Sequence, residues 1–255
     1  MLKYTVLTLV ILLTLFLIPN ALLADEMPNA EEPAIALGYV DFPPYEFEEE
    51  GKPSGVLVKI VNMLFEKADV PLDLQLYPFK RAFNSTKEGQ IDGLFNFYKT
   101  EERLESFDYT DPIITNPLVL FVRKDSNIEY SSLEDLKGLT IGTMLGYSYG
   151  PAFDKSTLFF KDATSSHASN FKKLALSRID AYPCDKLVGL HVAMSSDLMS
   201  ELKMLTIPVK VMDGHIGFTK GKHQDTIQKL NKVIKEMHDS GEIKETIDQY
   251  IVNEM

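Results

Sequence analysis

Short apolar runs alternate along the chain with stretches in which apolar residues recur every three or four positions. The runs have the length of strands, and they are Ile35–Val40, Leu72–Tyr77, Ile91–Phe97, Leu139–Gly142 and Ile179–Tyr182. Between the first two runs, one face of a predicted helix carries Leu57, Ile60, Val61, Leu64, Phe65 and Ala68. Strands that alternate with helices are typical of βα units, so the pattern predicts an α/β fold with a mostly parallel sheet.

Further helices are predicted later in the chain. A short one begins near Phe79 and stops at Gly89, and another covers Phe171–Leu176. Two more close the chain, because apolar stripes run from Ile227 to Met237 and from Ile243 to Ile251, with Gly241 between them.

The two halves of this pattern contain a similar short segment. Gln90-Ile91-Asp92-Gly93 and Arg178-Ile179-Asp180-Ala181 both lead from a helix end through Ile-Asp to a small residue. The similarity suggests two lobes of like construction. We expect Asp92 and Asp180 to be structural, each capping the turn into a strand.

The first residues have the order of a secretory signal peptide. Lys3 precedes an apolar run from Val6 to Ile18, and Ala24 precedes the acidic Asp25 and Glu26. A retained membrane anchor is the alternative, since about 20 apolar residues span a bilayer. We predict residues 1–24 to be a signal peptide cleaved near Ala24, which implies an exported, periplasmic protein.

Composition restricts the function further. The chain of 255 residues has a formal net charge of −11, whereas nucleic acids and anionic lipids require clustered Lys and Arg. Cys184 is the only cysteine, so no internal disulfide forms. The five histidines lack metal-ligand spacing, and no phosphate loop, dinucleotide glycine pattern, HExxH or nucleophile elbow occurs. We therefore expect no cofactor, no metal and no catalytic residue. The acidic stretch Glu46–Gly55 is interpreted as a solvated hairpin tip rather than a cation site.

Several short motifs follow one another in a characteristic order. They are Asp41-Phe42-Pro43-Pro44-Tyr45, a helix opened by Gly55, Gly89–Gly93, Thr100-Glu101-Glu102-Arg103, Phe107–Pro112, Ser131 to Gly138, Ile141-Gly142, Arg178–Ala181 with Asp185, and Ser240–Ile243 with Tyr250. Over residues 35 to 251 this order resembles the extracytoplasmic solute-binding proteins of family 3, which serve polar amino acid ABC transporters.

The resemblance implies a type II periplasmic-binding-protein fold. Each of two lobes would be a mixed, mostly parallel sheet flanked by helices, with residues 25–121 plus 216–255 in lobe 1 and 122–215 in lobe 2. Two hinge strands would cross near Phe121–Arg123 and His215–Phe218, and the lobes would close on a ligand. The protein would be a monomer that captures a small, amino-acid-like solute and delivers it to an ABC permease in the membrane.

The resemblance also implies a site for a zwitterion. Arg103 stands where relatives bind the ligand's carboxylate, for which a planar guanidinium is well suited. The alternative is a surface arginine paired with Glu101 or Glu105. Asp185 stands where relatives bind the α-ammonium, the alternative being an ordinary exposed aspartate near a strand end.

The remaining site residues are expected around these two charges. Phe42, Tyr45 and Tyr98 would form the walls, although core packing is an alternative role for each. Thr100 belongs to the arginine motif. Gly146, Tyr147 and Ser148 are expected to open a helix whose free N–H groups contact the carboxylate.

Some positions depart from the family's pattern. Leu57 and Lys59 stand where many relatives have acids, while Asn96 and Tyr98 replace small serines or threonines beside the ligand. The identity of the ligand therefore stays open, and so do two other functions of the protein. One is a periplasmic enzyme similar to cyclohexadienyl dehydratase, and the other is a binding partner of a sensory receptor.

Overall fold

The computed structural model describes residues 33–254, and residues 34 onward form one compact unit. The predicted signal peptide, residues 1–24 with its cleavage near Ala24, lies outside the described residues. Within them, no helix is both long and apolar enough to cross a bilayer.

A first strand group consists of β1 (Ile35–Tyr39), β4 (Leu72–Leu76) and β5 (Gly93–Tyr98). These strands are parallel and lie in the order β4-β1-β5. The connections carry α2 (Val56–Lys67) and α3 (Phe79–Lys87). The strand and helix predictions for this part of the chain are confirmed, with ends that shift by one or two residues.

A second strand group has the same construction. It consists of β8 (Thr140–Met144), β9 (Phe160–Thr164) and β10 (Ala181–Asp185), with β8 parallel to both neighbours. Helix α6 (His167–Ala175) precedes β10, and α7 (Lys186–Ser195) follows it directly.

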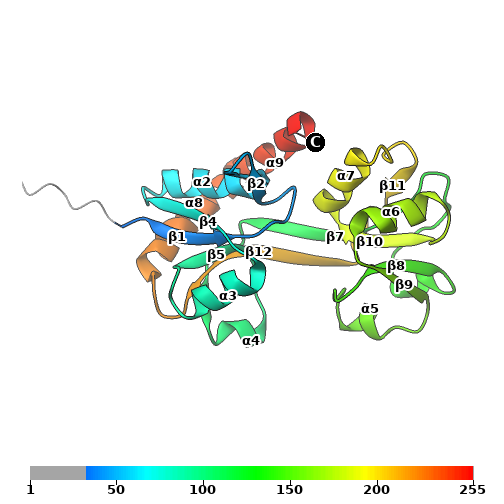
Figure 1. Cartoon of the computed structure of the whole chain (residues 1–255), viewed down its shortest axis with the longest axis horizontal. Coiled ribbons are helices and arrows are strands. Elements are labelled where there is room, and N and C mark those ends of the chain that lie inside the picture. Colours follow the sequence, from blue (N-terminus) through cyan, green and yellow to red (C-terminus); the bar gives the residue numbers. More distant parts are fainter. Residues whose placement is uncertain (1–32, 255) are drawn as a thin grey trace, which may run out of the picture. The chain divides into compact units, whose positions relative to one another are not determined.

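Two long strands connect the groups. β7 (Ile114–Arg123) and β12 (Lys210–Thr219) pair with each other in antiparallel register, from Ile114–Leu118 to Lys210–Gly214. β12 then pairs with β5 and β7 with β10, so the sheet order is β4-β1-β5-β12-β7-β10-β8-β9. Figure 1 shows both strands running from one group to the other. The fold class is therefore confirmed, although the two parallel sets belong to one continuous mixed sheet.

The remaining elements are short except at the C-terminus, where the two predicted helices are confirmed. They are β2 (Phe47–Glu49), β3 (Lys52–Ser54), α4 (Glu101–Leu104), β6 (Phe107–Tyr109), the 3₁₀ helix η1 (Leu133–Leu136), α5 (Pro151–Lys155), β11 (Leu202–Met204), α8 (Gln224–Ser240) and α9 (Glu242–Glu254).

The aspartates of the two Ile-Asp segments have the same structural role. The Asp92 carboxylate accepts the N–H of Ala36 at 2.8 Å, at the start of β1. The Asp180 carboxylate accepts the N–H of Thr140 at 2.8 Å, at the start of β8. Both aspartates are therefore structural, as predicted, and they satisfy backbone donors that a strand end leaves unpaired.

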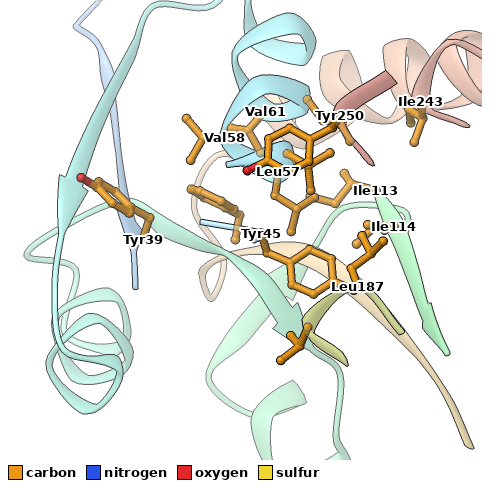
Figure 2. Packing of buried hydrophobic residues seen from close by; sticks show 14 of the residues in the cluster. Tyr39, Tyr45, Leu57, Val58, Val61, Ile113, Ile114, Leu187, Ile243 and Tyr250 are labelled. Atoms are coloured by element: carbon orange, nitrogen blue, oxygen red, sulfur yellow. The ribbon is translucent and has the colours of Figure 1, made fainter. Parts of the chain in front are cut away.

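The predicted stripe on α2 is buried in the largest hydrophobic cluster. Figure 2 shows Leu57 and Val61 of this helix close to Tyr250 of α9, while Ile243 of the same cluster lies further along α9. The cluster also contains Leu187 of α7, so its members come from both ends of the sheet. Burial of such side chains is worth roughly 1.5–3 kcal/mol each and accounts for the docking of these helices.

Candidate functional site

A cavity of about 1210 Å³ lies where strands of both groups end. One part of its wall follows β1, at Val40–Phe42, and includes the end of β5 and the residues after it, at Asn96–Thr100. Another part follows β8 and completes β10, at Tyr147–Tyr149 and Pro183–Asp185. Open α/β sheets bind their ligands at the carboxyl ends of strands, so this cavity is the candidate site.

Most of the residues predicted from the sequence line this cavity. They are Phe42, Asn96, Tyr98, Thr100, Arg103, Tyr147, Ser148 and Asp185. Tyr45 and Gly146 do not line it.

Arg103 is placed by α4, whose N-cap is Thr100. The Thr100 hydroxyl accepts the Arg103 N–H at 3.3 Å, and the Arg103 Nη1 donates to the Tyr98 carbonyl at 2.8 Å. Its guanidinium carbon lies 4.4 Å from the centre of the Phe97 ring, a cation–π contact. Partial burial lowers the pKa of Arg103.

The alternative pairing of Arg103 with Glu101 or Glu105 is not formed. The ion pairs found among residues 33–254 include none with this arginine. The guanidinium is thus held by a carbonyl and a ring, which are neutral groups. Donors remain for a further carboxylate, and the charge is not yet compensated.

Asp185 is the N-cap of α7 and is only 9% exposed, so the interpretation as an exposed aspartate is wrong. Its Oδ1 accepts the N–H groups of Leu187 and Val188 at 3.0 and 3.1 Å and the Tyr45 hydroxyl at 2.7 Å. Its Oδ2 is buried without a partner among the described residues. Burial raises the pKa of Asp185, and the three hydrogen bonds oppose that rise.

Glu46 overturns part of the hairpin interpretation. Glu48, Glu49 and Glu50 are exposed at the tip of the β2–β3 hairpin, as expected, but Glu46 is 1% exposed and lines the cavity. The Phe42 N–H donates to the Glu46 carbonyl at 2.7 Å, which returns the chain to Phe42 across Pro43 and Pro44. Rigid turn geometry around the two prolines is the signal that could have placed this residue beside Phe42.

The Glu46 carboxyl has no cationic partner within the described part of the chain. Burial raises its pKa to about 8, against hydrogen bonds from the Val40 N–H and the Asn96 side chain. A carboxyl in this state becomes ionised when a positive group is brought to it.

An irregularity in the sheet sets the orientation of the Asn96 and Tyr98 side chains. Asn96 has a φ of 52°, and the register of β12 against β5 shifts between His215 and Gly217. Such bulges re-aim side chains next to functional sites, and asparagine tolerates positive φ. Asn116 then donates to the Asn96 side chain at 3.2 Å and to the Tyr98 hydroxyl at 3.1 Å.

The prediction that Gly146–Ser148 opens a helix is wrong. This segment is a turn after β8, and α5 begins only at Pro151. The Tyr147 N–H already donates to the Met144 carbonyl at 3.2 Å. The Ser148 hydroxyl is engaged with Asp154. Tyr147 and Ser148 therefore reach the cavity as side chains of a turn.

His167 and Cys184 also line the cavity, although the sequence did not indicate either as a site residue. The Cys184 Sγ lies 3.5 Å from His167 Nδ1. Burial raises the pKa of the thiol well above its usual range and lowers the pKa of the imidazole. Both groups are neutral at pH 7, whereas a nucleophilic cysteine requires the thiolate.

Among residues 33–254 no group of three His, Cys, Asp or Glu side chains could hold a metal ion. The site is therefore built from a guanidinium, two desolvated carboxyls and aromatic walls. It can bind a small molecule that carries charges of both signs.

Comparison with known proteins agrees with this chemistry. The family described as "Bacterial extracellular solute-binding proteins, family 3" matches residues 35–253. Two relatives from Bacillus subtilis are each 26% identical: the "Probable amino-acid-binding protein YxeM" over 81% of this chain and 79% of its own length, and the arginine-binding extracellular protein ArtP over 84% of both. The solved substrate-binding protein of an amino acid ABC transporter is 26% identical, with a TM-score of 0.61 over 86% of this chain and 99% of that one. These relatives are binding proteins rather than enzymes.

Proposed function

The chain belongs to the bacterial extracellular solute-binding proteins of family 3, and from that premise we propose that it captures an α-amino acid and delivers it to an ABC permease. One observation carries the proposal. Arg103 and Asp185 carry opposite charges, line the same cavity, and each lacks a counter-ion in the described residues. A zwitterionic ligand supplies both missing charges at once.

The ligand's carboxylate binds Arg103. Charge-assisted hydrogen bonds from a guanidinium fix the orientation of a carboxylate as well as its position. The α-ammonium binds Asp185 at Oδ2, the oxygen that accepts no hydrogen bond from the described residues. Aromatic side chains of the lining, Phe42 and Tyr98, cover the apolar part of the ligand.

Glu46 determines the class of side chain that the ligand carries. A buried carboxyl without a cation favours a ligand whose distal end is positive, because that charge repays the cost of ionising Glu46. The relative ArtP is an arginine-binding protein by name, and this supports a basic amino acid as the ligand.

Hinge closure accompanies binding in this proposal. Residues 25–121 plus 216–255 act as one lobe and residues 122–215 as the other, joined by β7 and β12. The Tyr45–Asp185 hydrogen bond connects the two lobes next to β7, because Asp185 pairs with Leu118 of that hinge strand. Small-angle X-ray scattering should show a smaller radius of gyration with ligand, and an unchanged radius would contradict the hinge.

The proposal includes the export of the protein and its location. Residues 1–24 direct export and are removed near Ala24, and the mature protein acts as a periplasmic monomer. Mass spectrometry of protein from the cell envelope should find an N-terminus at or near Asp25. An intact, membrane-held N-terminus would refute the cleavage.

A thermal-shift screen tests the ligand class. Each amino acid is compared with its decarboxylated and its deaminated analogue. A ligand at 100 times its Kd adds about 2.7 kcal/mol of stability, which is readily detected. The expected result is a shift with one or more basic amino acids that both analogues lose. Equal shifts with plain organic acids would overturn the zwitterion assignment, and turnover of cyclic amino acid precursors would support the enzyme instead.

A further inference from the structure

Tyr45 does not line the cavity, and yet it touches the site through one atom. Its hydroxyl donates to Asp185 Oδ1 at 2.7 Å, across 140 residues of sequence. Both side chains are buried, at 1% and 9% exposure. A charge-assisted hydrogen bond in such a desolvated place is stronger than one between neutral groups.

The position of the Tyr45 hydroxyl is set by rigid surroundings. The ring stacks on Phe42, with centroids 5.6 Å apart. The Tyr45 carbonyl accepts the N–H of Leu57 at 2.8 Å, in the first turn of α2. Only glycine fits at position 55, because a Cβ there would lie 2.5 Å from the Tyr45 carbonyl oxygen. The Tyr45 ring and backbone are therefore both held, which fixes the position of the hydroxyl.

The two oxygens of Asp185 have unequal surroundings as a result. Oδ1 accepts three donors: the Tyr45 hydroxyl and the N–H groups of Leu187 and Val188. Oδ2 accepts none from the described residues, although it is buried. The helix cap holds Oδ1 from α7, and the Tyr45 hydroxyl holds the same oxygen from the segment before α2.

We propose that Tyr45 is a positioning residue: its hydroxyl holds Asp185 at Oδ1 so that Oδ2 is left free to accept the ligand's α-ammonium. This inference rests on the proposed function, since it assigns the ammonium to Asp185. It changes the role of Tyr45 from a wall of the pocket to a support for the group that binds.

The titration of Asp185 reports the contact directly. The titratable groups that face Asp185 are the Tyr45 and Tyr98 hydroxyls and the Cys184 thiol. Each of these has a raised pKa and is neutral at pH 7. Since Tyr45 lowers the pKa of Asp185, removal of its hydroxyl moves the titration to higher pH.

The first experiment needs no ligand. Carboxyl-carbon NMR follows Asp185 in the wild type and in Tyr45→Phe, with the resonance identified by its loss in Asp185→Asn. Tyr39→Phe is the matched control, because Tyr39 is equally buried and does not contact Asp185. The expected result is a titration at higher pH in Tyr45→Phe alone, and an unchanged titration would overturn the inference. If Tyr45→Phe does not fold, difluorotyrosine at position 45 strengthens the donor and should shift the titration to lower pH.

The second experiment measures binding of L-arginine and of 5-guanidinopentanoate, which lacks only the α-ammonium. Tyr45→Phe should weaken L-arginine binding about tenfold, and more at low pH, while changing binding of the analogue little. An equal loss for both probes indicates a merely structural role and overturns the inference. Failure of wild-type protein to bind any α-amino acid, or normal binding by Arg103→Ala, would refute the proposed function instead, and the NMR titration would still decide the role of Tyr45.

Discussion

The two strand groups share a scaffold and differ in the charge that they bring to the cavity. Asp92 and Asp180 hold Ala36 near the start of β1 and Thr140 at the start of β8 by equivalent hydrogen bonds of 2.8 Å. At the other ends of the strands, the first group presents Arg103 beside aromatic rings, and the second presents Asp185 at a helix N-terminus.

Under the proposed function, the difference explains how a pair of opposite charges is kept apart for a ligand. Arg103 is supported by a carbonyl and by rings, and Asp185 by N–H groups and a hydroxyl. Neutral partners orient a charge without cancelling it. An ion pair within the protein would have satisfied both residues and left nothing for a zwitterion.

The largest expected effect comes from removing the charge of the first group. Arg103→Ala should weaken binding of the amino acid by roughly thirtyfold or more, because stranding one partner of a buried charge pair costs about 2–5 kcal/mol. Isothermal titration calorimetry measures the loss. Arg81→Ala, at an exposed arginine of α3, is the control and should bind normally. Normal binding by Arg103→Ala would refute the carboxylate assignment.

Removing the charge of the second group should have a selective effect. Asp185→Asn keeps a good helix cap, so the fold remains, but it loses the ammonium partner. Binding of the amino acid should fall about tenfold or more, and binding of the deaminated analogue should not. The comparison is measured by calorimetry with exposed Asp197→Asn as control. Loss in the arginine variant alone would indicate a plain organic acid as ligand.

Glu46, the second desolvated carboxyl of the site, extends the comparison to the dependence of binding on pH. With a pKa of about 8, Glu46 is protonated in the empty site at pH 7 and must lose that proton to pair with a cation. Affinity for a basic amino acid should therefore rise about tenfold per unit as pH increases from 6 to 8, and level off above. Glu46→Gln should abolish this rise, as should a ligand with a neutral side chain. A flat profile in the wild type would contradict the role of Glu46.

The smallest effects concern the shared scaffold. Asp92→Ala and Asp180→Ala should each lower the free energy of unfolding by about 1–2 kcal/mol, because each leaves a strand N–H without its charged acceptor. Urea denaturation measures both. Neither residue lines the cavity, so ligand affinity should stay unchanged. If a variant changed the ligand affinity and left the free energy of unfolding unaltered, the structural role of that aspartate would be contradicted.

Local features of the sequence determined the elements and much of the site. Apolar periodicity predicted α2 and the parallel strands, since burial of one face is a property of short segments. The Ile-Asp repeat predicted the two structural aspartates. The resemblance to family 3 implied two ligand-binding charges, Arg103 and Asp185, and both do line one cavity.

Tertiary structure alone decided which groups those charges meet. Glu46 reads as one more residue of an acidic hairpin, and only the turn at Pro43–Pro44 buries it beside Phe42. Tyr45 reads as an aromatic wall, and its hydrogen bond to Asp185 requires residues far apart in the chain to meet. Burial depends on the packing of many segments, and a long-range hydrogen bond requires two distant residues to meet, so both arise only when the whole chain has folded. Periodicity and capping, by contrast, are present in each segment.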